Sequence, residues 1–259
     1  MSRQNDEAAA LVRAYFGACL DRYGHDPRGV DWQSTAAQRA RFAAVLAVGD
    51  LDGATLLDAG CGLGDFYGYL CECGIAARYT GCDLSTPHVA AARKAYPDAR
   101  FVAADVQEIL ANERFDYVIG CGLLHLRVPR WNRWAWSIIR AMYDGCLRGV
   151  AFTLPRRGAG HPPVLAAVDP ADWLARLRTL SPTVEARPLD PWGDTLFLLR
   201  KHNTFRPRQG RATRLYPRGT HPDSPRACQP TALAGARWTR YPAADRAPVS
   251  LVLLAEPGT

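Results

Sequence analysis

The middle of the chain alternates between short apolar runs, typical of buried strands, and segments whose apolar residues recur at the three-to-four-residue spacing of helices. Strands are predicted at Thr55–Ala59, Arg78–Cys82, Ala99–Ala103, Phe115–Ile119, Gly149–Leu154, Thr183–Pro188 and Thr195–Arg200. Helices are predicted at Asp65–Cys73, Thr86–Tyr96, Trp131–Gly145 and Pro170–Leu180. Such alternation with short connections predicts an α/β fold, in which helices cover both faces of a doubly wound sheet.

The last two predicted strands differ from the others because no helix separates them. The connection Leu189–Gly193, which contains Pro191 and Gly193, suits a hairpin turn. We therefore expect the last strand to be antiparallel to its neighbours.

The two ends of the chain show other patterns. Residues 1–50 are predicted to be helical: Glu7–Arg22 has helical spacing, a break follows at residues 25–29, and Ser34 caps a second helix. In residues 204–259 the periodicity stops, and eight of the 19 prolines fall there. We expect this segment to be an irregular, disordered tail, in which Val249–Leu254 is one short apolar run.

The net charge of +7 depends on the tail. Nine of the 32 basic residues but only three of the 25 acidic residues lie in residues 204–259, so the first 203 residues are close to neutral. The core therefore lacks the basic surface expected of a protein that binds nucleic acid. The tail is either a basic extension that attracts an acidic partner or the product of a shifted reading frame.

Composition narrows the class of protein. No apolar run approaches the roughly 18 residues that a membrane span needs, and a start that carries Asp6 and Glu7 does not suit a signal peptide. Most of the eight cysteines fall in or beside predicted strands and helices, without the paired spacing of a zinc site. We expect a cytoplasmic protein with free thiols, no metal and no membrane partner.

The segment that follows the first predicted strand carries the clearest chemical signal. Gly60, Gly62 and Gly64 stand at alternate positions, and a predicted helix comes next. Glycines allow a tight turn and let the backbone approach a ligand where a Cβ would clash, while the helix start adds unpaired N–H groups. The same triplet also occurs in ordinary strand-to-helix turns, so the neighbouring residues must show whether it marks a ligand site.

Acidic residues follow the next two strands. Asp83 ends the second predicted strand, where a carboxylate can accept both hydroxyls of a ribose, or alternatively cap the following helix. Asp105 follows the third strand and can accept from an adenine amino group, with Val106 packed beside the ring. These residues lie at the carboxyl ends of strands, where open α/β sheets bind ligands.

The glycine spacing argues against a dinucleotide. In the dinucleotide fingerprint the third glycine comes one position later, and Asp65 here would repel a pyrophosphate. Asp65 instead suits the first turn of a helix, where the helix dipole favours a carboxylate. S-adenosylmethionine has no phosphate but carries an ammonium and a sulfonium, which suit acids such as Asp58. A nicotinamide-dependent oxidoreductase is the less favoured alternative.

The pattern Asp58-x-Gly60-x-Gly62-x-Gly64, with Asp83, Asp105 and the strand that begins at Phe115, resembles class I S-adenosylmethionine-dependent methyltransferases. The resemblance spans about Leu11–Lys201. It implies a Rossmann-like seven-stranded sheet with an antiparallel last strand. It also implies three regions: a helical lid at 1–50, a cofactor domain at 51–203 and the tail at 204–259.

The resemblance also implies roles for individual residues. Asp58 would face the methionine ammonium, and Asp83 would hold the ribose. The remaining cofactor contacts would come from Gly60, Gly62 and Gly64 along the methionine, Leu84, Asp105 and Val106 around the adenine, and Cys121 as a small residue at the exit of the fourth strand.

Residues 121–126, after the fourth strand, would face the methyl acceptor. His125 is the candidate general base because its ordinary pKa lies near neutrality, although a histidine packed or hydrogen-bonded for structural reasons is an equal alternative. Trp131 is a candidate for the acceptor pocket, whereas Trp134 is expected in the core. No Asn-Pro-Pro-Tyr-like run is present, which argues against amino methylation of nucleic-acid bases.

The resulting hypothesis is a methyltransferase that acts on oxygen or nitrogen of a small-molecule acceptor. The alternative is a non-catalytic module that binds S-adenosylmethionine or a partner, because the acceptor side carries no equally clear motif. The sequence specifies neither the acceptor nor the oligomeric state.

Overall fold

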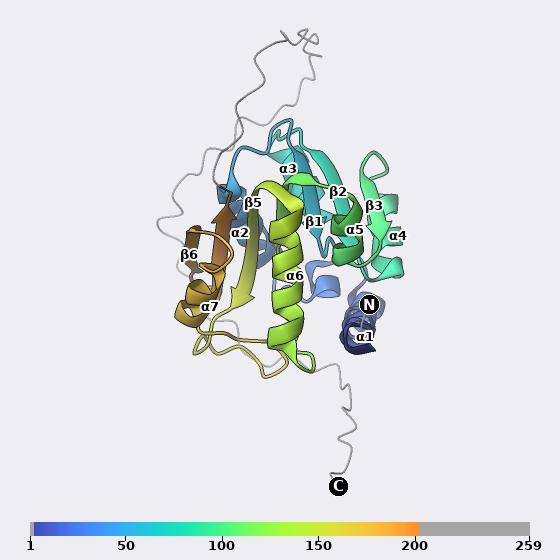
Figure 1. Cartoon of the computed structure of the whole chain (residues 1–259). Helices are drawn as coiled ribbons and strands as arrows, with labels where there is room; N and C mark the ends of the chain where they lie inside the picture. Colours follow the sequence, from blue (N-terminus) through green and yellow to red (C-terminus); the bar gives the residue numbers. More distant parts are fainter. Residues whose placement is uncertain (1–2, 202–259) are drawn as a thin grey trace, which may run out of the picture.

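Seven strands form one sheet at the centre of the computed structural model, which describes residues 3–201 (Figure 1). The strands are β1 (Thr55–Ala59), β2 (Arg78–Asp83), β3 (Arg100–Ala103), β4 (Phe115–Gly120), β5 (Cys146–Pro155), β6 (Thr183–Leu189) and β7 (Asp194–Arg200). Their order is β3-β2-β1-β4-β5-β7-β6. Only β7 runs against its neighbours β5 and β6, which confirms the predicted doubly wound sheet with an antiparallel last strand.

The order of the strands changes direction between β1 and β4. The chain moves outward from β1 to β3 and then returns to pair β4 with the other side of β1. The connections after β1 and β4 therefore leave in opposite directions, which opens a crevice at the carboxyl edge of the sheet.

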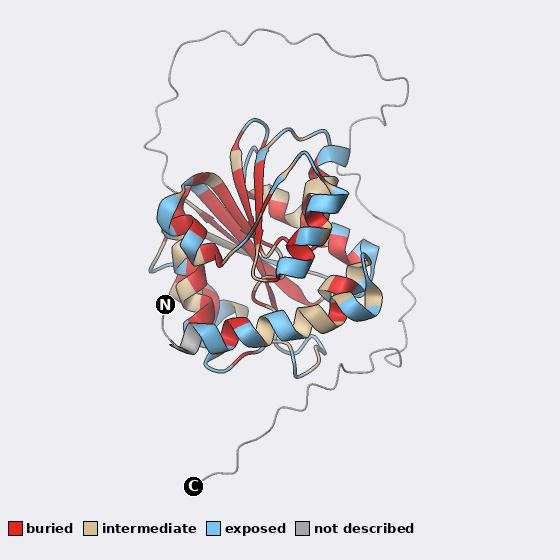
Figure 2. Cartoon of the chain, turned by 90° about the vertical axis from the view of Figure 1, so that its right-hand side faces the viewer, coloured by how far each residue is buried: buried red, intermediate tan, exposed pale blue. Residues whose placement is uncertain are grey.

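Neighbouring residues of the central strands pack on opposite faces of the sheet. Leu57 and Val118 join one core with helices α5, α6 and α7, while Leu56 and Ile119 join a second core with α2, α3 and α4. Figure 2 shows the central strands buried along most of their length between helices with exposed outer sides. These helices span Thr35–Val45 (α2), Asp65–Glu72 (α3), Thr86–Ala95 (α4), Val106–Asn112 (α5), Trp131–Gly145 (α6) and Pro170–Leu177 (α7).

The N-terminal segment crosses from one core to the other. Ala8 of α1 (Arg3–Tyr23) packs in the first core, and Phe42 of α2 packs in the second. Between them lies the short 3-10 helix η1 (Pro27–Val30), and a second one, η2 (Leu46–Val48), follows α2. Ser34 caps α2 as predicted, because its hydroxyl accepts from the Ala37 amide at 3.1 Å.

Helix α5 was not predicted from the sequence. Most other helices and strands begin and end within a few residues of their predicted bounds. Asp105 caps α5 by accepting from the Gln107 amide at 2.7 Å. The predicted tail at 204–259 and its apolar run Val249–Leu254 lie outside the described residues. Within residues 3–201, no helix combines the length and apolarity that a bilayer-spanning segment requires.

Candidate functional site

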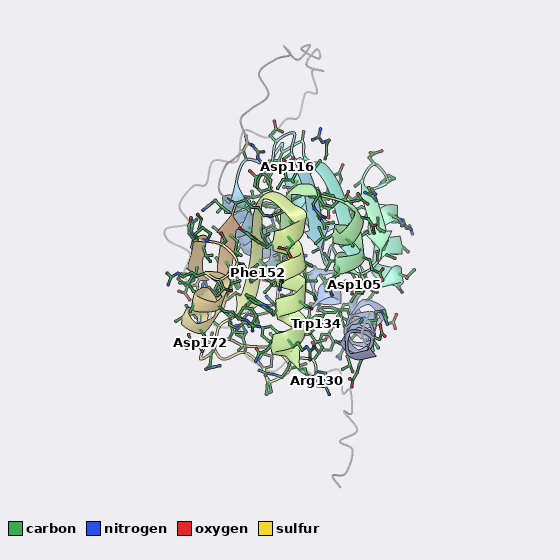
Figure 3. All side chains as sticks on the ribbon, viewed as in Figure 1. Asp105, Asp116, Arg130, Trp134, Phe152 and Asp172 are labelled. Atoms are coloured by element: carbon green, nitrogen blue, oxygen red, sulfur yellow. The ribbon has the colours of Figure 1, made fainter. Side chains whose placement is uncertain are left out.

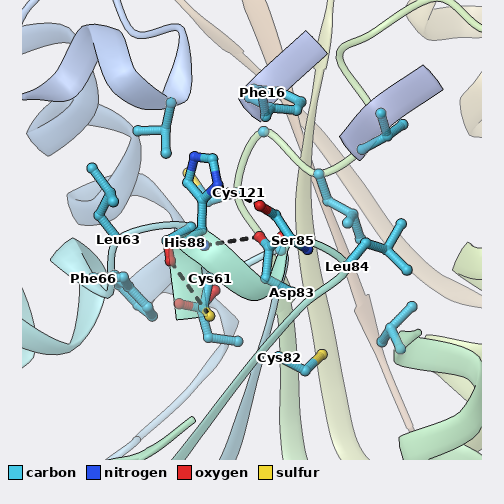
Figure 4. Close-up of a pocket in the computed structure, with 18 of the residues that line it drawn as sticks. Phe16, Cys61, Leu63, Phe66, Cys82, Asp83, Leu84, Ser85, His88 and Cys121 are labelled. Carbon is cyan, nitrogen blue, oxygen red and sulfur yellow. Dashed lines mark hydrogen bonds between the residues drawn. The ribbon is translucent and has the colours of Figure 1, made fainter. Parts of the chain in front are cut away.

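A deep cleft lies at the carboxyl edge of the sheet, where β1, β2 and β4 end. We call it the main cleft. Figure 4 shows Asp83, Leu84 and Ser85 on one wall, with Phe16 of α1 above them. The predicted residues that line it are Asp58, Gly60, Gly62, Asp83, Leu84, Asp105, Val106 and Cys121.

The turn requires glycine for two reasons: its backbone has positive φ angles, and a Cβ would clash with neighbouring atoms. Gly62 has a φ of +53°, and a Cβ there would lie 2.8 Å from Cγ1 of Val30. Gly64 has a φ of +82° and serves as the N-cap of α3, with its Cα facing the ring of Phe101 rather than the cleft. Gly64 therefore shapes the turn, while Gly60 and Gly62 form the wall.

Asp83 joins the two sides of the main cleft. One carboxylate oxygen accepts from the Gly62 amide at 3.0 Å, and the other accepts from the Ser85 amide at 2.8 Å. Burial raises the pKa of Asp83, and these backbone hydrogen bonds oppose that rise. Each oxygen can still accept a second hydrogen bond from a ligand. The N-cap of the following helix is Ser85, so the capping alternative for Asp83 is wrong.

Asp58 lies deeper in the same cleft and is 3% exposed. The Tyr79 hydroxyl donates to its Oδ2 at 2.6 Å. The pKa of Asp58 is raised to about 7. Burial is the main cause, the negative charges of Asp83 and Asp65 add to the rise, and the hydrogen bond from Tyr79 opposes it. A cation in the cleft would favour the ionised form.

Trp134, rather than Trp131, contributes to the main cleft. Trp134 lies on α6 near its amino end, and Figure 3 shows it at mid-height between Phe152 and Arg130. Trp131 is buried, donates its Nε1 proton to the Leu124 carbonyl at 3.0 Å and packs against Trp173. Positions three residues apart lie on the same face of a helix, so spacing alone does not separate the two indoles. They differ because that face meets the main cleft at Trp134, whereas at Trp131 it meets the Leu124 carbonyl and Trp173 of α7.

The thiols beside the main cleft are protonated. Burial raises the pKa values of Cys61, Cys82 and Cys121 well above that of an ordinary thiol. Cys121 is therefore a small neutral residue in the wall of the cleft and does not suit a nucleophile.

Two side chains, those of Asp65 and His88, tie the N-terminal segment to the cleft, and neither contact role was predicted from the sequence. Asp65 accepts from the Gln38 side chain at 2.8 Å, and its other oxygen lies 3.2 Å from Nε2 of His25. The buried ring of His88 bridges Ser85 Oγ at 2.7 Å and the Gly29 carbonyl at 3.2 Å. These bonds hold residues 25–38 over the carboxyl edge of the sheet.

A second space, the side chamber, adjoins the main cleft. It shares Phe16, Val30, Trp32 and Gly122 with the main cleft. Its remaining polar lining includes Tyr15, Asp31, Gln33, Arg41, His125, His161 and Asp194. Of these residues, only His125 was predicted from the sequence as a site residue.

His125 is held in place by β5 and by the N-terminal segment. Its Nε2 lies 3.1 Å from the hydroxyl of buried Thr153, and Trp32 packs edge-on against its ring at 5.7 Å. Burial lowers the pKa of His125 to about 4; Asp194 opposes this and Arg41 reinforces it. The imidazole is therefore neutral at pH 7.

Comparison with known proteins identifies the central segment. Residues 56–145 match the family model described as a methyltransferase domain. Among solved structures, magnesium protoporphyrin IX methyltransferase from Synechocystis PCC 6803, with bound S-adenosylmethionine, has a TM-score of 0.57 and 20% identity, covering 75% of this chain and 97% of that chain.

A second similar structure is the 1,6-didemethyltoxoflavin-N1-methyltransferase of Burkholderia thailandensis, with bound 1,6-didemethyltoxoflavin and S-adenosylhomocysteine. Its TM-score is 0.57 at 24% identity, covering 78% of this chain and 92% of that chain. These likenesses support the fold. No curated protein matches this chain.

Proposed function

We propose that this chain is a class I S-adenosylmethionine-dependent methyltransferase whose acceptor is a small molecule that binds in the side chamber and is methylated on oxygen or nitrogen. The observation that carries this proposal is the position of the side chamber. It adjoins the main cleft at Gly122, so an acceptor there would lie next to the donor. Its enclosed, partly aromatic lining suits a small ligand better than a polymer.

The residues of the main cleft suit the cofactor. Asp83 has lone pairs available for two ribose hydroxyls, and the ionised form of Asp58 suits the methionine ammonium. When bound, S-adenosylmethionine supplies an electrophilic methyl group on a sulfonium. We assign the adenine to the wall formed by Leu84, Asp105 and Val106 and the methionine to the wall formed by Gly60, Gly62 and Cys121.

His125 suits the acceptor side because it is neutral and lines the side chamber. For a role as base, Nε2–H donates to Thr153 Oγ1, which leaves the Nδ1 lone pair as the proton acceptor. As the acceptor oxygen or nitrogen forms its bond to carbon, its proton becomes strongly acidic. Even a weakly basic imidazole then takes that proton, and alignment supplies much of the remaining rate.

The test is formation of S-adenosylhomocysteine. Purified protein is incubated with S-adenosylmethionine and fractionated pools of small metabolites, with parallel arms that contain protein or nucleic acid as acceptor. We expect turnover in a metabolite fraction and a methylated product in that fraction. Turnover with a polymer alone would overturn the small-molecule proposal. Tight cofactor binding without turnover in any arm would favour a non-catalytic binding module.

A further inference from the structure

The first residue of the last strand lies in the side chamber. Because β7 is antiparallel, its amino end lies at the same edge of the sheet as the carboxyl ends of its parallel neighbours, opposite Pro155 of β5. Asp194, which begins β7, is 1% exposed and lines the side chamber with His125 and His161. A carboxylate buried to this degree needs a compensating charge and hydrogen bonds.

Arg41 supplies the charge but satisfies only one carboxylate oxygen. Its Nε donates to Asp194 Oδ2, and its other nitrogens donate to the backbone carbonyls of Ala37 at 2.8 Å and Trp192 at 3.3 Å. The guanidinium also lies over the ring of Trp32, 4.7 Å from its centre. The Arg41 guanidinium is thus bound by protein groups on several sides. It compensates the charge of Asp194 and does not bind an incoming ligand.

The other oxygen, Oδ1, has no hydrogen-bond partner among the described residues. His161 Nε2 lies 3.6 Å away, but that nitrogen lies 2.8 Å from the Gly193 carbonyl. Buried polar atoms in native proteins nearly always have a partner, since leaving one unpaired is costly. An unpaired oxygen on a residue that lines the side chamber indicates a donor that arrives with the ligand.

We propose that Oδ1 of Asp194 recognises the methyl acceptor by accepting a hydrogen bond from its N–H or O–H group. The inference rests on the proposed function of the side chamber. It specifies the class of acceptor as a neutral or cationic ring compound that bears such a donor. A carboxylate or phosphate would face the negative oxygen, while the one arginine in the chamber wall is engaged by Asp194.

The test uses two matched pairs of ring probes, phenol with anisole and indole with 1-methylindole, together with benzoate. Affinities are measured by ligand-observed NMR on the full chain saturated with S-adenosylhomocysteine. Within each pair the donor-bearing probe should bind roughly tenfold more tightly or better, because a hydrogen bond to a charged group is lost in the methylated probe. Benzoate should bind most weakly. Equal affinity within both pairs, or preference for benzoate, would overturn the proposal.

Asp194→Asn supplies the matched variant. Its amide oxygen can still accept from Arg41, which turns the NH2 group toward the chamber and replaces an acceptor with a donor. The preference for phenol over anisole should then fall to within about threefold. Melting temperature and affinity for S-adenosylhomocysteine establish that the variant is folded. An unchanged preference in the folded variant contradicts the role of Asp194.

A crystal structure of the wild-type protein with phenol provides a second measurement if the variant does not fold. The phenol hydroxyl within hydrogen-bond distance of Oδ1 supports the proposal, whereas an ordered water at Oδ1 with phenol elsewhere overturns it. These measurements need no turnover. Failure of methyl transfer with intact probe selectivity would therefore reject the enzyme function and leave the recognition site standing.

Discussion

Tyr79 on β2 donates its hydroxyl proton to Asp58 on the neighbouring strand β1, at 2.6 Å and out of contact with bulk water. Burial of Asp58 favours the neutral acid, and the hydrogen bond from Tyr79 favours the carboxylate. Their balance sets the pKa at about 7, so the charge in the deepest part of the main cleft changes near physiological pH.

Affinity for S-adenosylhomocysteine should therefore fall as the pH drops through about 7. The raised pKa means that Asp58 is protonated below this value and loses its attraction for the methionine ammonium, which predicts about tenfold weaker binding at pH 6 than at pH 8. Calorimetric titration across this range measures the effect. Tyr79→Phe should move the midpoint to higher pH, and Asp58→Asn should remove the step. An identical profile for Tyr79→Phe contradicts the coupling.

Asp83→Ala should weaken cofactor binding by roughly 1.5–3 kcal/mol through loss of the proposed ribose hydrogen bonds. The structure adds a second cause, because the substitution also frees the Gly62 and Ser85 amides. Asp83→Asn is the matched control, since it keeps an oxygen for one of these bonds. Calorimetry with S-adenosylhomocysteine gives both values. Parental affinity in Asp83→Ala would show that the ribose lies elsewhere.

His125→Asn should lower turnover about 10²-fold or more while leaving affinity for S-adenosylhomocysteine unchanged. The pH profile provides a separate check. Because burial places the pKa of His125 at about 4, kcat should show no histidine step between pH 6 and 8. Turnover within threefold of the parent would assign His125 a structural role, through Thr153.

Asp65 should control how firmly residues 25–38 hold to the cleft. Asp65→Asn preserves shape and should cost under about 1 kcal/mol of stability. Asp65→Ala removes the bonds to Gln38 and His25 and should cost about 1–2 kcal/mol, with faster amide exchange in α2. Gln38→Ala is the matched control for one of the two bonds. Exchange in α2 that matches the parent would contradict this role.

Truncation after Asn203 should leave the fold and the cofactor affinity intact. Within residues 3–201, the sheet already has the seven strands expected of the fold, and both cores are built from residues before Arg200. We expect a melting temperature within a few degrees of the parent. A fall of more than about 10 °C, which means several kcal/mol for a domain of this size, would place part of residues 204–259 against the core.

Local patterns in the sequence were sufficient to predict the strands, the glycine turn and the acidic strand ends. Each strand carries its own apolar run, and each turn carries its own glycine or proline, so neighbouring residues specify them. Helix α5 was missed although Val106, Ile109 and Leu110 have helical spacing, because its seven residues are too few for a clear period.

The lining of the side chamber could largely not be predicted, because its residues are far apart in the sequence. Arg41 and Asp194 are 153 positions apart and come from a helix and a strand that meet only in the folded sheet. A buried arginine has the same appearance in the sequence as an exposed one. Trp131 and Trp134 show the same limit on a smaller scale, since helical spacing gives a face but not what that face meets.

Because β7 is antiparallel, the residues proposed to bind the methyl donor and the residue proposed to bind the acceptor come from separate stretches of the sequence. The assigned cofactor wall comes from residues 58–106 with Cys121, whereas the recognition oxygen of the chamber comes from the hairpin between β6 and β7, almost 90 positions beyond Asp105. Substitutions in the hairpin can thus change which molecule is methylated without touching the glycine turn. If the proposed site is correct, a library confined to positions 190–194 and Arg41 should alter acceptor selectivity while leaving cofactor affinity largely unchanged.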